Sequence, residues 1–574
     1  MSIFTPPSAV SASHAPTQHK SAQSRPAFGL TPARLVLFSA GYFFLVLNVA
    51  LLAKLLGIIN ALDQVSPGFV LTIPLFFVAC FNAIFSLFTV FRCEKPVLIF
   101  FILLSSLLSY AMYNYGTIVD RDMIVNILET NAGEAKSYLN LTAGLWFVFT
   151  GVLPAALILK LHIKRSTVVR ELLMKLVSII VSALVILLIA TFYYKDYASV
   201  GRNNAYLNKM IIPTHFTHSL YGYVQDTYFK EDIPYRPLGE DATLSAQSPD
   251  SRKQLLVLMV GETARADNFQ YGGYERDTNA FTQPLGVTYF QQVSSCGTAT
   301  AVSVPCMFSR LSKSDFSDTQ AANQDNLMDI VQRAGINTLW LDNDGGCKGV
   351  CERIKTIEFK PDANTPVCDG DYCQDQVLLD GLSAQLDQLS EQNNMIVLHM
   401  VGSHGPTYYK RYPAEFSHFQ PDCQRSDIQN CDARQLNNTY DNTLYYSDYI
   451  MSKVITLLKQ RQDLSTGMLY VSDHGESLGE SGLYLHGMPY SLAPTEQTHV
   501  PMLTWFSDAF VADKQLDEQC LRQDAKNSVY SHDNLFDSIL GLMNVSTDLY
   551  QAQLDVFNGC RGQGRIALNQ ASSK

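Results

Sequence analysis

Two different patterns of apolar and polar residues divide the chain. Between Leu35 and Tyr194 charges are sparse and apolar runs are long, whereas acidic and polar residues return from Glu231 onward. A helix needs about 20 apolar residues to cross a hydrocarbon core of about 30 Å. Five stretches satisfy this: Leu35–Gly57, Gly68–Phe91, Pro96–Met112, Thr142–Leu161 and Leu172–Tyr193. Five such runs in succession exceed what the core of a soluble protein requires, so the pattern predicts five membrane-spanning helices.

The later part of the chain has shorter apolar runs. Those typical of buried strands are Gln254–Val260, Asn337–Leu341, Met395–Val401, Gly467–Val471 and Val500–Phe506. Helical stretches such as Asp375–Gln392 and Asn442–Arg461 separate them. This alternation indicates an α/β domain with a mostly parallel sheet covered on both faces. In such sheets the functional site lies beyond the carboxyl ends of the strands.

These patterns divide the 574 residues into four parts. We expect a disordered tail over residues 1–33, a five-helix transmembrane domain over 34–195, an interfacial helix and linker over 196–250, and the α/β domain over 251–574. The linker begins with apolar and aromatic residues suited to a membrane surface. Around Pro234–Pro249 its composition is typical of a tether.

Basic residues in the short loops predict the orientation, because Lys and Arg accumulate on the cytoplasmic side. Residues 1–34 hold three basic residues and no acidic one, and residues 160–175 hold five basic residues. Residues 114–140 hold four acidic ones. We therefore expect the tail inside the cell and everything beyond Tyr194 outside the membrane.

Composition excludes two broad classes. Charged residues make up 17% of the chain, against about 25% in typical soluble proteins, and the mean hydropathy is +0.03. A wholly soluble protein is therefore excluded. The net charge of −11 disfavours a nucleic-acid partner, because phosphate backbones require a basic face.

Ten of the twelve cysteines lie beyond residue 290. Their spacing suits disulfides in an oxidising compartment, which independently supports the orientation. The predicted pairs are Cys296–Cys306, Cys347–Cys351, Cys368–Cys373, Cys423–Cys431 and Cys520–Cys560. A zinc ribbon is the alternative, but the sequence has no CxxC knuckle.

Carboxylates and imidazoles follow four of the predicted strands. They are Glu262 after the first, Asp342, Asn343, Asp344 and Lys348 after the second, His404 after the third, and Asp473, His474 and then His486 after the fourth. Such groups meeting at one sheet edge supply the oxygen and nitrogen ligands of a tetrahedral zinc site. On spacing alone, a metal site and ordinary surface turns remain equally open.

The segment SCGTATAVSVPCMFSR places small hydroxyl residues before a predicted helix. A threonine at a helix N-terminus lies where backbone N–H groups and the helix dipole favour phosphate. Bound to Zn²⁺, its hydroxyl would become a nucleophile; an ordinary capping turn is the alternative. In the acidic loop formed by residues 114–140, Asn126, Thr130 and Glu134 would share one face of a helix. That face could contact a lipid headgroup, or it could simply be solvated.

These motifs, in this order after five spans, closely resemble those of the lipid A phosphoethanolamine transferases. That family consists of inner-membrane enzymes of the alkaline phosphatase superfamily and includes the mobile colistin-resistance enzymes. The matching motifs are VGET, SCGTATAVSVPCMFS, DNDGGCKGVC, GSHGP, SDHGES and LHGMP. The resemblance covers nearly the whole chain beyond the tail, and it implies that residues 251–574 form a periplasmic, zinc-dependent catalytic domain.

The resemblance also implies a role for each matching residue. Thr300 would be the nucleophile, and Glu262, Thr300, Asp473 and His474 would hold one catalytic Zn²⁺. His404 and His486 would bind the phosphoryl group or a second zinc, and Lys348 and Thr298 would contact the donor headgroup. Asn126, Thr130 and Glu134 match positions that contact phosphatidylethanolamine, which favours the headgroup interpretation of these residues.

Two positions depart from some relatives. Val302 stands where they have tyrosine, and Asp344 where they have asparagine. Neither departure touches the metal set. The carboxylate of Asp344 would instead pair with the ammonium group of the donor.

The implied reaction is ping-pong transfer of phosphoethanolamine from phosphatidylethanolamine to a lipid A phosphate. Zinc-activated Thr300 would carry the group as a covalent intermediate, and Lys348, His404 and His486 would offset charge on the phosphoryl oxygens. The added ammonium would lower the affinity of lipid A for polymyxins such as colistin. We expect a multi-pass inner-membrane protein, acting as a monomer.

Five alternatives to this function can be weighed against the motifs. The acceptor could be a lipopolysaccharide core sugar or a protein, or the enzyme could transfer phosphoglycerol. A sulfatase would need Cys or Ser followed by x-Pro-x-Arg, and the segment Ser303–Met307 lacks the arginine. A lipid-binding sensor without activity is disfavoured, because Glu262, Thr300, Asp473 and His474 are all intact.

Overall fold

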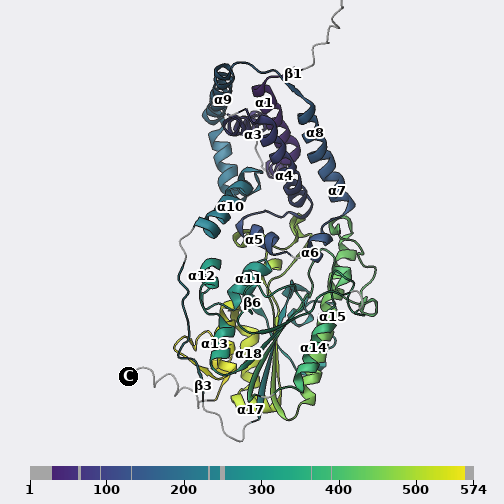
Figure 1. Cartoon of the computed structure of the whole chain (residues 1–574). Coiled ribbons are helices and arrows are strands. Elements are labelled where there is room, and N and C mark those ends of the chain that lie inside the picture. The colour runs from purple at the N-terminus through teal and green to yellow at the C-terminus, as the bar shows by residue number, and fades with distance from the viewer. Residues whose placement is uncertain are drawn as a thin grey trace, which may run out of the picture.

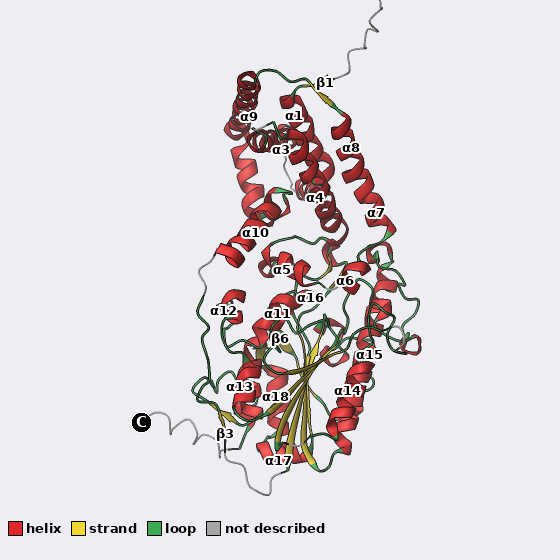
Figure 2. Ribbon diagram, in the orientation of Figure 1, coloured by secondary structure: helices red, strands yellow, loops and turns green. Residues whose placement is uncertain are grey.

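The structure is a computed structural model that describes residues 29–61, 66–90, 92–130, 132–229, 233–245, 252–362, 365–389 and 391–562. A helical part and an α/β part are stacked end to end (Figure 1). The helices of the first part lie beyond the ends of the strands in the central sheet of the second part (Figure 2).

The helical part contains the expected spans. Its long elements are α3 (Pro67–Phe88), α4 (Glu94–Tyr115), α7 (Leu141–Phe147) continuing into α8 (Leu153–Lys160), and α9 (Val168–Asn203). The first predicted span is α1 (Pro32–Tyr42) followed by α2 (Val49–Asn60), bent by 67°. Among the described residues four helices are long and apolar enough to cross a membrane, or five if the bent pair is one span.

The expected boundaries differ from the structure at two places in this part. The fifth span, α9, continues to Asn203, eight residues past the boundary at 195, and a short helix at Ala205–Met210 and α10 (Thr214–Val224) follow it. Residues 1–28 of the predicted tail lie outside the described residues. Its last residues are ordered, because β1 (Gly29–Leu30) pairs in parallel with β2 (His162–Ile163).

The predicted tether is also partly wrong. Leu238 and Ala242 are buried in the core of the α/β part, and β3 (Thr243–Leu244) pairs with β15 (Val545–Ser546). The carboxylate of Asp325 accepts hydrogen bonds from the Tyr235 hydroxyl and from the backbone N–H of Leu238. Burial of these apolar side chains fixes residues 235–244 to the α/β part.

The α/β part is built on a seven-stranded sheet in the order β5-β13-β10-β4-β9-β7-β8. The parallel strands are β10 (Leu464–Ser472), β4 (Lys253–Gly261), β9 (Asn393–His399), β7 (Asn337–Asp342) and β8 (Lys355–Glu358). The predicted strand at Val500–Phe506 is β13 (Met502–Phe506), which runs antiparallel to both β10 and β5 (Thr288–Phe290). The sheet is therefore mostly parallel, as predicted.

Alternate residues of β4 explain why helices cover both faces. Leu256, Leu258 and Val260 belong to the core formed with α13 (Leu327–Arg333) and α19 (Leu535–Leu542). Leu255 and Val257 face the core formed with α14 (Gln376–Leu386) and α15 (Ala433–Gln460). Successive side chains of a strand point to opposite faces, so an uninterrupted apolar strand must be covered twice.

Smaller elements complete this part. They are α11 (Thr300–Met307), α12 (Asp318–Ala322), α16 (Thr495–Thr498), α17 (Asp508–Lys514), α18 (Glu518–Asn527), and the paired strands β6 (Gln292–Ser294) with β14 (Val529–Ser531) and β11 (Ser477–Leu478) with β12 (Tyr484–Leu485). Helix α15 begins nine residues before the predicted Asn442. Asp432 and Gln435 form a capping box there, which fixes the start of the helix.

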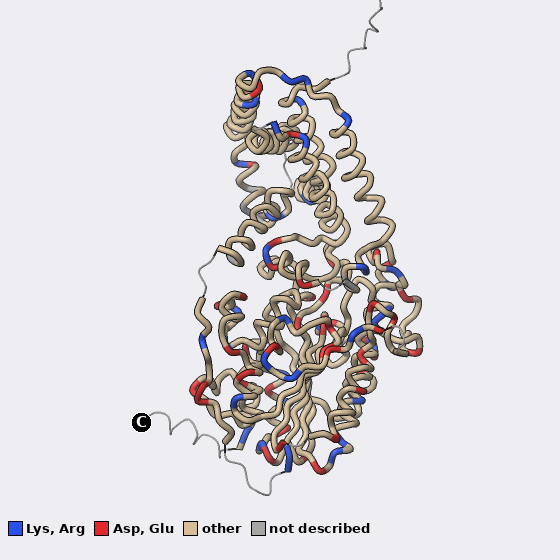
Figure 3. Tube along the Cα trace, viewed as in Figure 1, with Lys and Arg blue, Asp and Glu red and all other residues tan. Residues whose placement is uncertain are grey.

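Covalent links and charges distinguish the two parts further. All five cysteine pairs named above are disulfide-bonded, and Cys80 and Cys93 of the helical part are free. Charged residues are dense in the α/β part and sparse along the long helices (Figure 3). At the helix ends far from the sheet, Glu94 is buried between Lys175 at 2.8 Å and Arg165 at 3.0 Å.

Candidate active site

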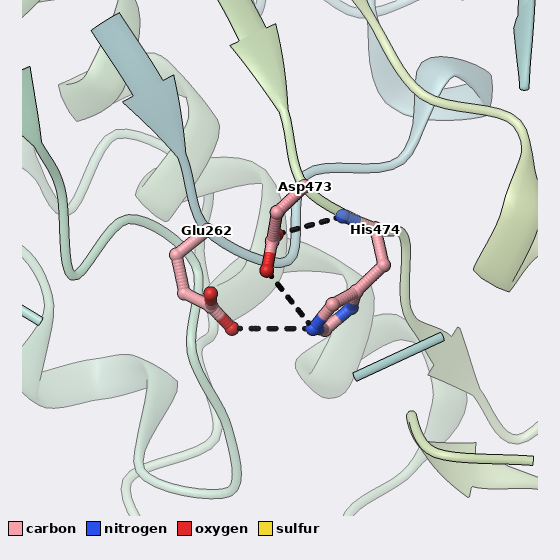
Figure 4. Close-up of side chains that lie close together, drawn as sticks. All are labelled: Glu262, Asp473 and His474. Carbon is pink, nitrogen blue, oxygen red and sulfur yellow. Dashed lines mark hydrogen bonds and ion pairs between the residues drawn. The ribbon is translucent and has the colours of Figure 1, made fainter. Parts of the chain in front are cut away.

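Three side chains that could hold a metal ion meet where two neighbouring strands end. Gly261 of β4 pairs with Ser472 of β10, so the next residues, Glu262 and Asp473, emerge side by side. His474 follows, and its Nε2 lies 3.5 Å from Glu262 Oε1 and 3.4 Å from Asp473 Oδ2. The two carboxylates and the imidazole point toward one another (Figure 4), and one ligand atom of each lies within 4.8 Å of the others.

Surrounding hydrogen bonds prepare this cluster for a cation. Nδ1 of His474 lies 2.9 Å from the carbonyl oxygen of Gly475; if Nδ1 carries the proton, Nε2 keeps its lone pair. Oδ1 of Asp473 accepts from the N–H groups of Thr263 and His474. Oδ2 of Asp473 is buried and accepts no hydrogen bond. A buried carboxylate oxygen without a donor is what a metal ligand requires, because an ion would complete it.

The pKa shifts within the cluster also favour a bound cation. Burial raises the pKa of Glu262, but the three neighbouring imidazoles lower it more, so its net pKa is below the usual range. Burial and the charge of Glu262 hold the pKa of Asp473 well above its usual value. Burial lowers the pKa of His474 to about 4. A divalent cation would offset both the burial and the repulsion from Glu262 that raise the pKa of Asp473, because it would bind both carboxylates in their charged form.

Thr300 opens helix α11 directly beside the cluster. Its hydroxyl donates a hydrogen bond to Glu262 Oε2 at 3.0 Å and lies 3.4 Å from His474 Nε2. The Cys296–Cys306 disulfide closes the segment that contains it, and the Ser303 hydroxyl donates to the carbonyl oxygen of Asp473. These links bind the start of α11 to the strand end that carries the other ligands.

His404 and His486 stand beside the same cluster. The His486 ring centre is 4.5 Å from that of His474 and 5.3 Å from that of His404, whose Nε2 is 4.0 Å from Glu262 Oε1. Nδ1 of His486 lies 2.8 Å from Glu476 Oε2, and Glu476 also accepts from the Tyr408 hydroxyl. Glu476 therefore orients His486. Its place in the SDHGES motif was a signal that sequence reasoning left unused.

Two more positioning residues had no motif to reveal them. Asp375 accepts from the N–H groups of Val401 and Gly402, which lead to His404, and from the Asn343 amide. His532 is fully buried; its Nδ1 accepts from the N–H of Cys296, and its Nε2 lies 2.9 Å from the carbonyl oxygen of Ser472. His532 thus links the Thr300 segment to the strand that ends at Asp473.

The second strand end contributes differently from the others. Asp342 does not face the cluster. Its Oδ2 accepts from Trp340 Nε1 and lies 3.0 Å from His399 Nδ1, and its pKa is lowered to about 2, because His399 outweighs the opposing effect of burial. Asp344 Oδ2 lies 3.6 Å from His399 Nε2. Asp344 and His404 line a cavity of about 290 Å³ that reaches Lys136 of α6 (Ala132–Ser137).

The acidic loop is two helices rather than one. Helix α5 (Arg121–Glu129) ends where Thr130 leaves the helical conformation, and α6 (Ala132–Ser137) begins after it. The Thr130 hydroxyl donates to the carbonyl oxygen of Asn126. The expectation that Asn126, Thr130 and Glu134 share one continuous helix face is therefore wrong; the side chain of Glu134 lies outside the described residues.

Helix α5 nevertheless packs over the site from the membrane side. Glu129 at its end lies in the field of Lys348; burial raises the pKa of Glu129, and Lys348 opposes that rise. The start of α5 lines a cavity of about 460 Å³ together with Thr298, Val302 and Lys313. The Thr298 hydroxyl donates to the carbonyl oxygen of Met488 at 2.6 Å.

The donor set matches the chemistry of zinc. Glu262, Asp473 and His474 supply two oxygens and one nitrogen. Thr300 Oγ1 lies beside Glu262 and His474 and would supply the fourth atom of a tetrahedral set.

Comparison with known proteins covers both parts of the chain. The family model described as phosphoethanolamine transferase EptA/EptB matches residues 77–228, and that described as sulfatase matches residues 254–545. The chain is 42% identical over 530 residues to phosphoethanolamine transferase EptA of Escherichia coli strain K12, covering 92% of this chain and 96% of that protein. It is 35% identical over 530 residues to phosphatidylethanolamine transferase Mcr-1 of Escherichia coli, covering 89% and 96%.

A solved structure is similar over the same extent. It is the integral membrane protein lipooligosaccharide phosphoethanolamine transferase A (EptA) of Neisseria meningitidis, with a TM-score of 0.88, 37% identity, and coverage of 93% of this chain and 99% of that one. The agreement spans the membrane helices, the junction and the catalytic part together. The chain belongs to the phosphoethanolamine transferase family of membrane-anchored enzymes in the alkaline phosphatase superfamily.

Proposed function

We propose that this enzyme moves phosphoethanolamine from phosphatidylethanolamine to a phosphate of lipid A, with Thr300 carrying the group between the two lipids. One observation carries the proposal: the Thr300 hydroxyl lies 3.0 Å from Glu262 and 3.4 Å from His474 at the start of a helix. Relatives named for Kdo(2)-lipid A and lipooligosaccharide support a phosphorylated glycolipid as acceptor.

The metal site would be held by Glu262, Asp473, His474 and Thr300. Zn²⁺ there would lower the pKa of the threonine hydroxyl and stabilise negative charge on the phosphoryl oxygens. Glu262, Asp473 and His474 come from two adjacent strand ends, so the rigid sheet would fix the metal beside the nucleophile.

In the first step the Thr300 oxygen attacks phosphorus. The Thr300 hydroxyl donates a hydrogen bond to Glu262 Oε2, which can accept the departing proton. The lone pairs of the Thr300 oxygen then face away from that carboxylate. The new bond joins phosphorus to Thr300 Oγ1, and the bond from phosphorus to the glycerol oxygen breaks. Diacylglycerol leaves when its oxygen takes up a proton, which balances the proton that Thr300 gave up.

His404 and His486, which stand beside the cluster, would serve this transfer. Glu476 fixes the orientation of His486 through Nδ1, which leaves Nε2 for the phosphoryl group or the leaving oxygen. Lys348 would add positive charge for the phosphoryl oxygens. In the second step an oxygen of the lipid A phosphate attacks phosphorus, and the bond to Thr300 breaks.

The donor headgroup would lie between the catalytic part and helices α5 and α6. The cavity beside Asp344 supports this, because a carboxylate there suits the ammonium of ethanolamine. Asn126, Thr130 and Glu134 would contact the headgroup from the membrane side, although not from one helix face. Thr298 is a weaker donor contact, because its hydroxyl is bonded to Met488.

The proposed orientation in the membrane is supported by the positions of basic residues and disulfides. The basic residues Arg92, Arg165 and Lys175 lie at the helix ends far from the catalytic part, which supports a cytoplasmic N-terminus and a periplasmic catalytic domain. Disulfides confined to the catalytic part fit that compartment. The added ammonium would reduce the negative charge of lipid A and weaken binding of cationic polymyxins.

The test uses full-length protein and its Thr300→Ala and Thr300→Ser variants. With phosphatidylethanolamine alone, wild type should acquire one phosphoethanolamine on the peptide containing Thr300, seen by mass spectrometry. The alanine variant should show neither this adduct nor modified lipid A, and the serine variant should retain some of both. Normal transfer by Thr300→Ala would overturn the assignment, and an adduct without lipid A modification would point to another acceptor.

A further inference from the structure

Arg411 is a charged side chain buried in the catalytic part next to the His404 loop. Its exposed fraction is 1%, and it follows a short helical turn at Tyr408–Lys410. Nε of Arg411 donates a hydrogen bond to the carbonyl oxygen of His404 at 2.8 Å. Both Nη groups are buried, and neither donates a hydrogen bond to the described part of the chain. The hydrogen bond that the guanidinium does make is therefore directed at a residue of the site.

The burial of this guanidinium is not explained by stability. Moving a charged group out of water carries a large free-energy penalty, which a full set of hydrogen bonds normally offsets. Here both Nη groups lack that compensation. An apolar side chain of similar volume would fill the same space without the penalty. A buried polar group of this kind requires another explanation, and function is the first to consider.

The charge of Arg411 also acts on the other end of the His404 loop. The carboxylate of Asp375 accepts hydrogen bonds from the backbone N–H groups of Val401 and Gly402. Burial raises the pKa of Asp375, and the positive charge of Arg411 opposes that rise. The segment 401–404 is thus held at its start by Asp375 and at its end by Arg411.

A disulfide-closed loop fixes the guanidinium itself. Cζ of Arg411 lies 3.9 Å from the centre of the Tyr372 ring, where a cation is attracted to the face of the ring. Tyr372 belongs to the loop that the Cys368–Cys373 disulfide closes. In the same loop, Asp369 accepts a hydrogen bond from Lys410 Nζ at 3.0 Å. Ring stacking and this neighbouring ion pair together restrict Arg411 to one position.

The position of the His404 backbone matters because its ring serves two places at once. His404 Nε2 lies 4.0 Å from Glu262 Oε1, and the same side chain lines the cavity beside Asp344. A hydrogen bond to the His404 carbonyl oxygen limits rotation of the peptide plane and hence the direction in which the side chain leaves the backbone. A displacement of about 1 Å at a reacting group can cost about a hundredfold in rate.

We propose that Arg411 is a positioning residue for the transfer reaction: it holds the His404 backbone so that the imidazole faces both the metal cluster and the cavity beside Asp344. This inference rests on the proposed function, since it presumes that His404 serves the phosphoryl transfer. Arg411 acts only through His404, and that requirement separates a positioning role from a general contribution to the fold.

The test is a double-mutant cycle in the full-length, zinc-loaded protein. Arg411→Lys keeps the positive charge but loses the planar group that bonds to His404 and stacks on Tyr372. It is combined with His404→Ala. Arg276→Lys is the matched control, because Arg276 also lies over an aromatic ring, 5.4 Å from the centre of Phe419, but lines a different cavity.

Three quantities are measured for each protein. They are the rate constant of diacylglycerol release at saturating phosphatidylethanolamine, the phosphatidylethanolamine concentration that gives half of this rate, and the bound zinc. Release of diacylglycerol needs no acceptor, so the result does not depend on the identity of the acceptor.

The expected result is a loss of rate that disappears without His404. Arg411→Lys should lower the rate constant about tenfold, with the half-saturating concentration and the zinc content unchanged. His404→Ala should lower the rate constant about a hundredfold, and adding Arg411→Lys to it should cause no further loss. Arg276→Lys should match wild type throughout.

Four outcomes overturn the proposal. A wild-type rate in Arg411→Lys removes the role of Arg411 alone, provided that His404→Ala is slow. A further tenfold loss in the double variant means that Arg411 does not act through His404. Loss of zinc in both Arg411→Lys and Arg411→Gln makes Arg411 a structural residue of the cluster. A wild-type rate in His404→Ala contradicts the role given to His404 in the proposed function, and the inference falls with it.

Discussion

The two halves of the chain are built for different solvents, lipid for the membrane half and water for the catalytic half. In the membrane half large apolar side chains face outward, for example Leu71 and Phe192, each 71% exposed. In the catalytic half Leu256 and Leu258 are fully buried. Among the described residues with large exposed apolar side chains, only Val529 lies beyond residue 235. Lipid therefore covers the apolar surface of the membrane half, whereas the catalytic half buries its apolar side chains in its own core.

That difference explains where each half keeps its polar groups. The catalytic half buries carboxylates and imidazoles in one cluster and holds them with five disulfides and a network of backbone hydrogen bonds. The membrane half has few polar contacts within its spans, such as Asn82 with Ser178 and Ser182. Changes in the catalytic half should therefore cost more than comparable changes in the membrane half, and the following experiments grade that contrast.

The largest effect is expected at the metal cluster. Glu262→Gln removes one anionic ligand, so bound zinc should be lost and transfer should fall by about a thousandfold or more. Metal analysis and transfer to lipid A measure both. Glu518→Gln, an exposed residue of α18, should leave both unchanged. Full zinc content in Glu262→Gln would remove Glu262 from the ligand set.

Next comes the longest disulfide loop. Cys520 and Cys560 are 40 residues apart, and Cys347 and Cys351 only 4. By the loop-entropy model, replacing the first pair with serine should lower the free energy of unfolding of the catalytic half by about 4 kcal/mol, and the second by about 2 kcal/mol. Denaturant unfolding of the full chain measures this. If either replacement also shifted the unfolding of the membrane half, the two halves would not unfold independently and the contrast between them would not hold.

His532 should make the catalytic half acid-sensitive. Burial lowers its pKa from 6.5 to about 4, so below pH 6.5 the unfolded chain binds a proton that the folded chain refuses. Stability from this group is present above pH 6.5 and is lost as pH falls toward 4, by up to about 3 kcal/mol. His532→Gln keeps a donor and an acceptor but does not titrate.

The measurement is the free energy of unfolding between pH 7 and pH 4. Wild type should lose more stability than His532→Gln over this interval. Equal slopes for the two proteins would mean that His532 is already protonated when folded.

A smaller effect is expected at the junction. Gly116→Ala places a side chain at a left-handed position and against Leu483, at a cost of about 1 kcal/mol before the contact is counted. Transfer should fall about fivefold, with zinc content unchanged, because only the segment before His486 is disturbed. Gly144→Ala in α7, where a Cβ meets nothing within 4 Å, is the control. Loss of zinc in Gly116→Ala would show that the junction reaches the metal cluster.

The smallest effect belongs within the membrane. Asn82→Ala removes two hydrogen bonds from α3 to α9, each worth about 0.6 kcal/mol in a membrane. Thermal unfolding of the membrane half in detergent should shift slightly, and transfer should not change. Thr191→Ala, whose hydroxyl bonds only within its own helix, is the comparison. A loss of transfer in Asn82→Ala would mean that helix packing controls the site.

Several features could be predicted from the sequence because they depend on local pattern. Membrane spans follow from runs of about 20 apolar residues, and cysteine pairs such as Cys347–Cys351 follow from short separations. Glu262, Asp473 and His474 were candidates because each follows an apolar strand. The break between α5 and α6 was missed, since nothing local marks Thr130 as the end of α5.

What the sequence by itself determined is the division into two solvents, the α/β class of the second half, and the residue types at the strand ends. The tertiary structure alone decided that β4 and β10 are neighbours, that Asp342 turns to His399 rather than to the metal cluster, and that Asp375, Glu476 and His532 hold the site in place. It also decided that residues 235–244 pack on the catalytic half and that β13 is antiparallel. The physical reason is range: periodicity and spacing act between residues close in the chain, whereas buried hydrogen bonds join residues such as Cys296 and His532, which are 236 positions apart.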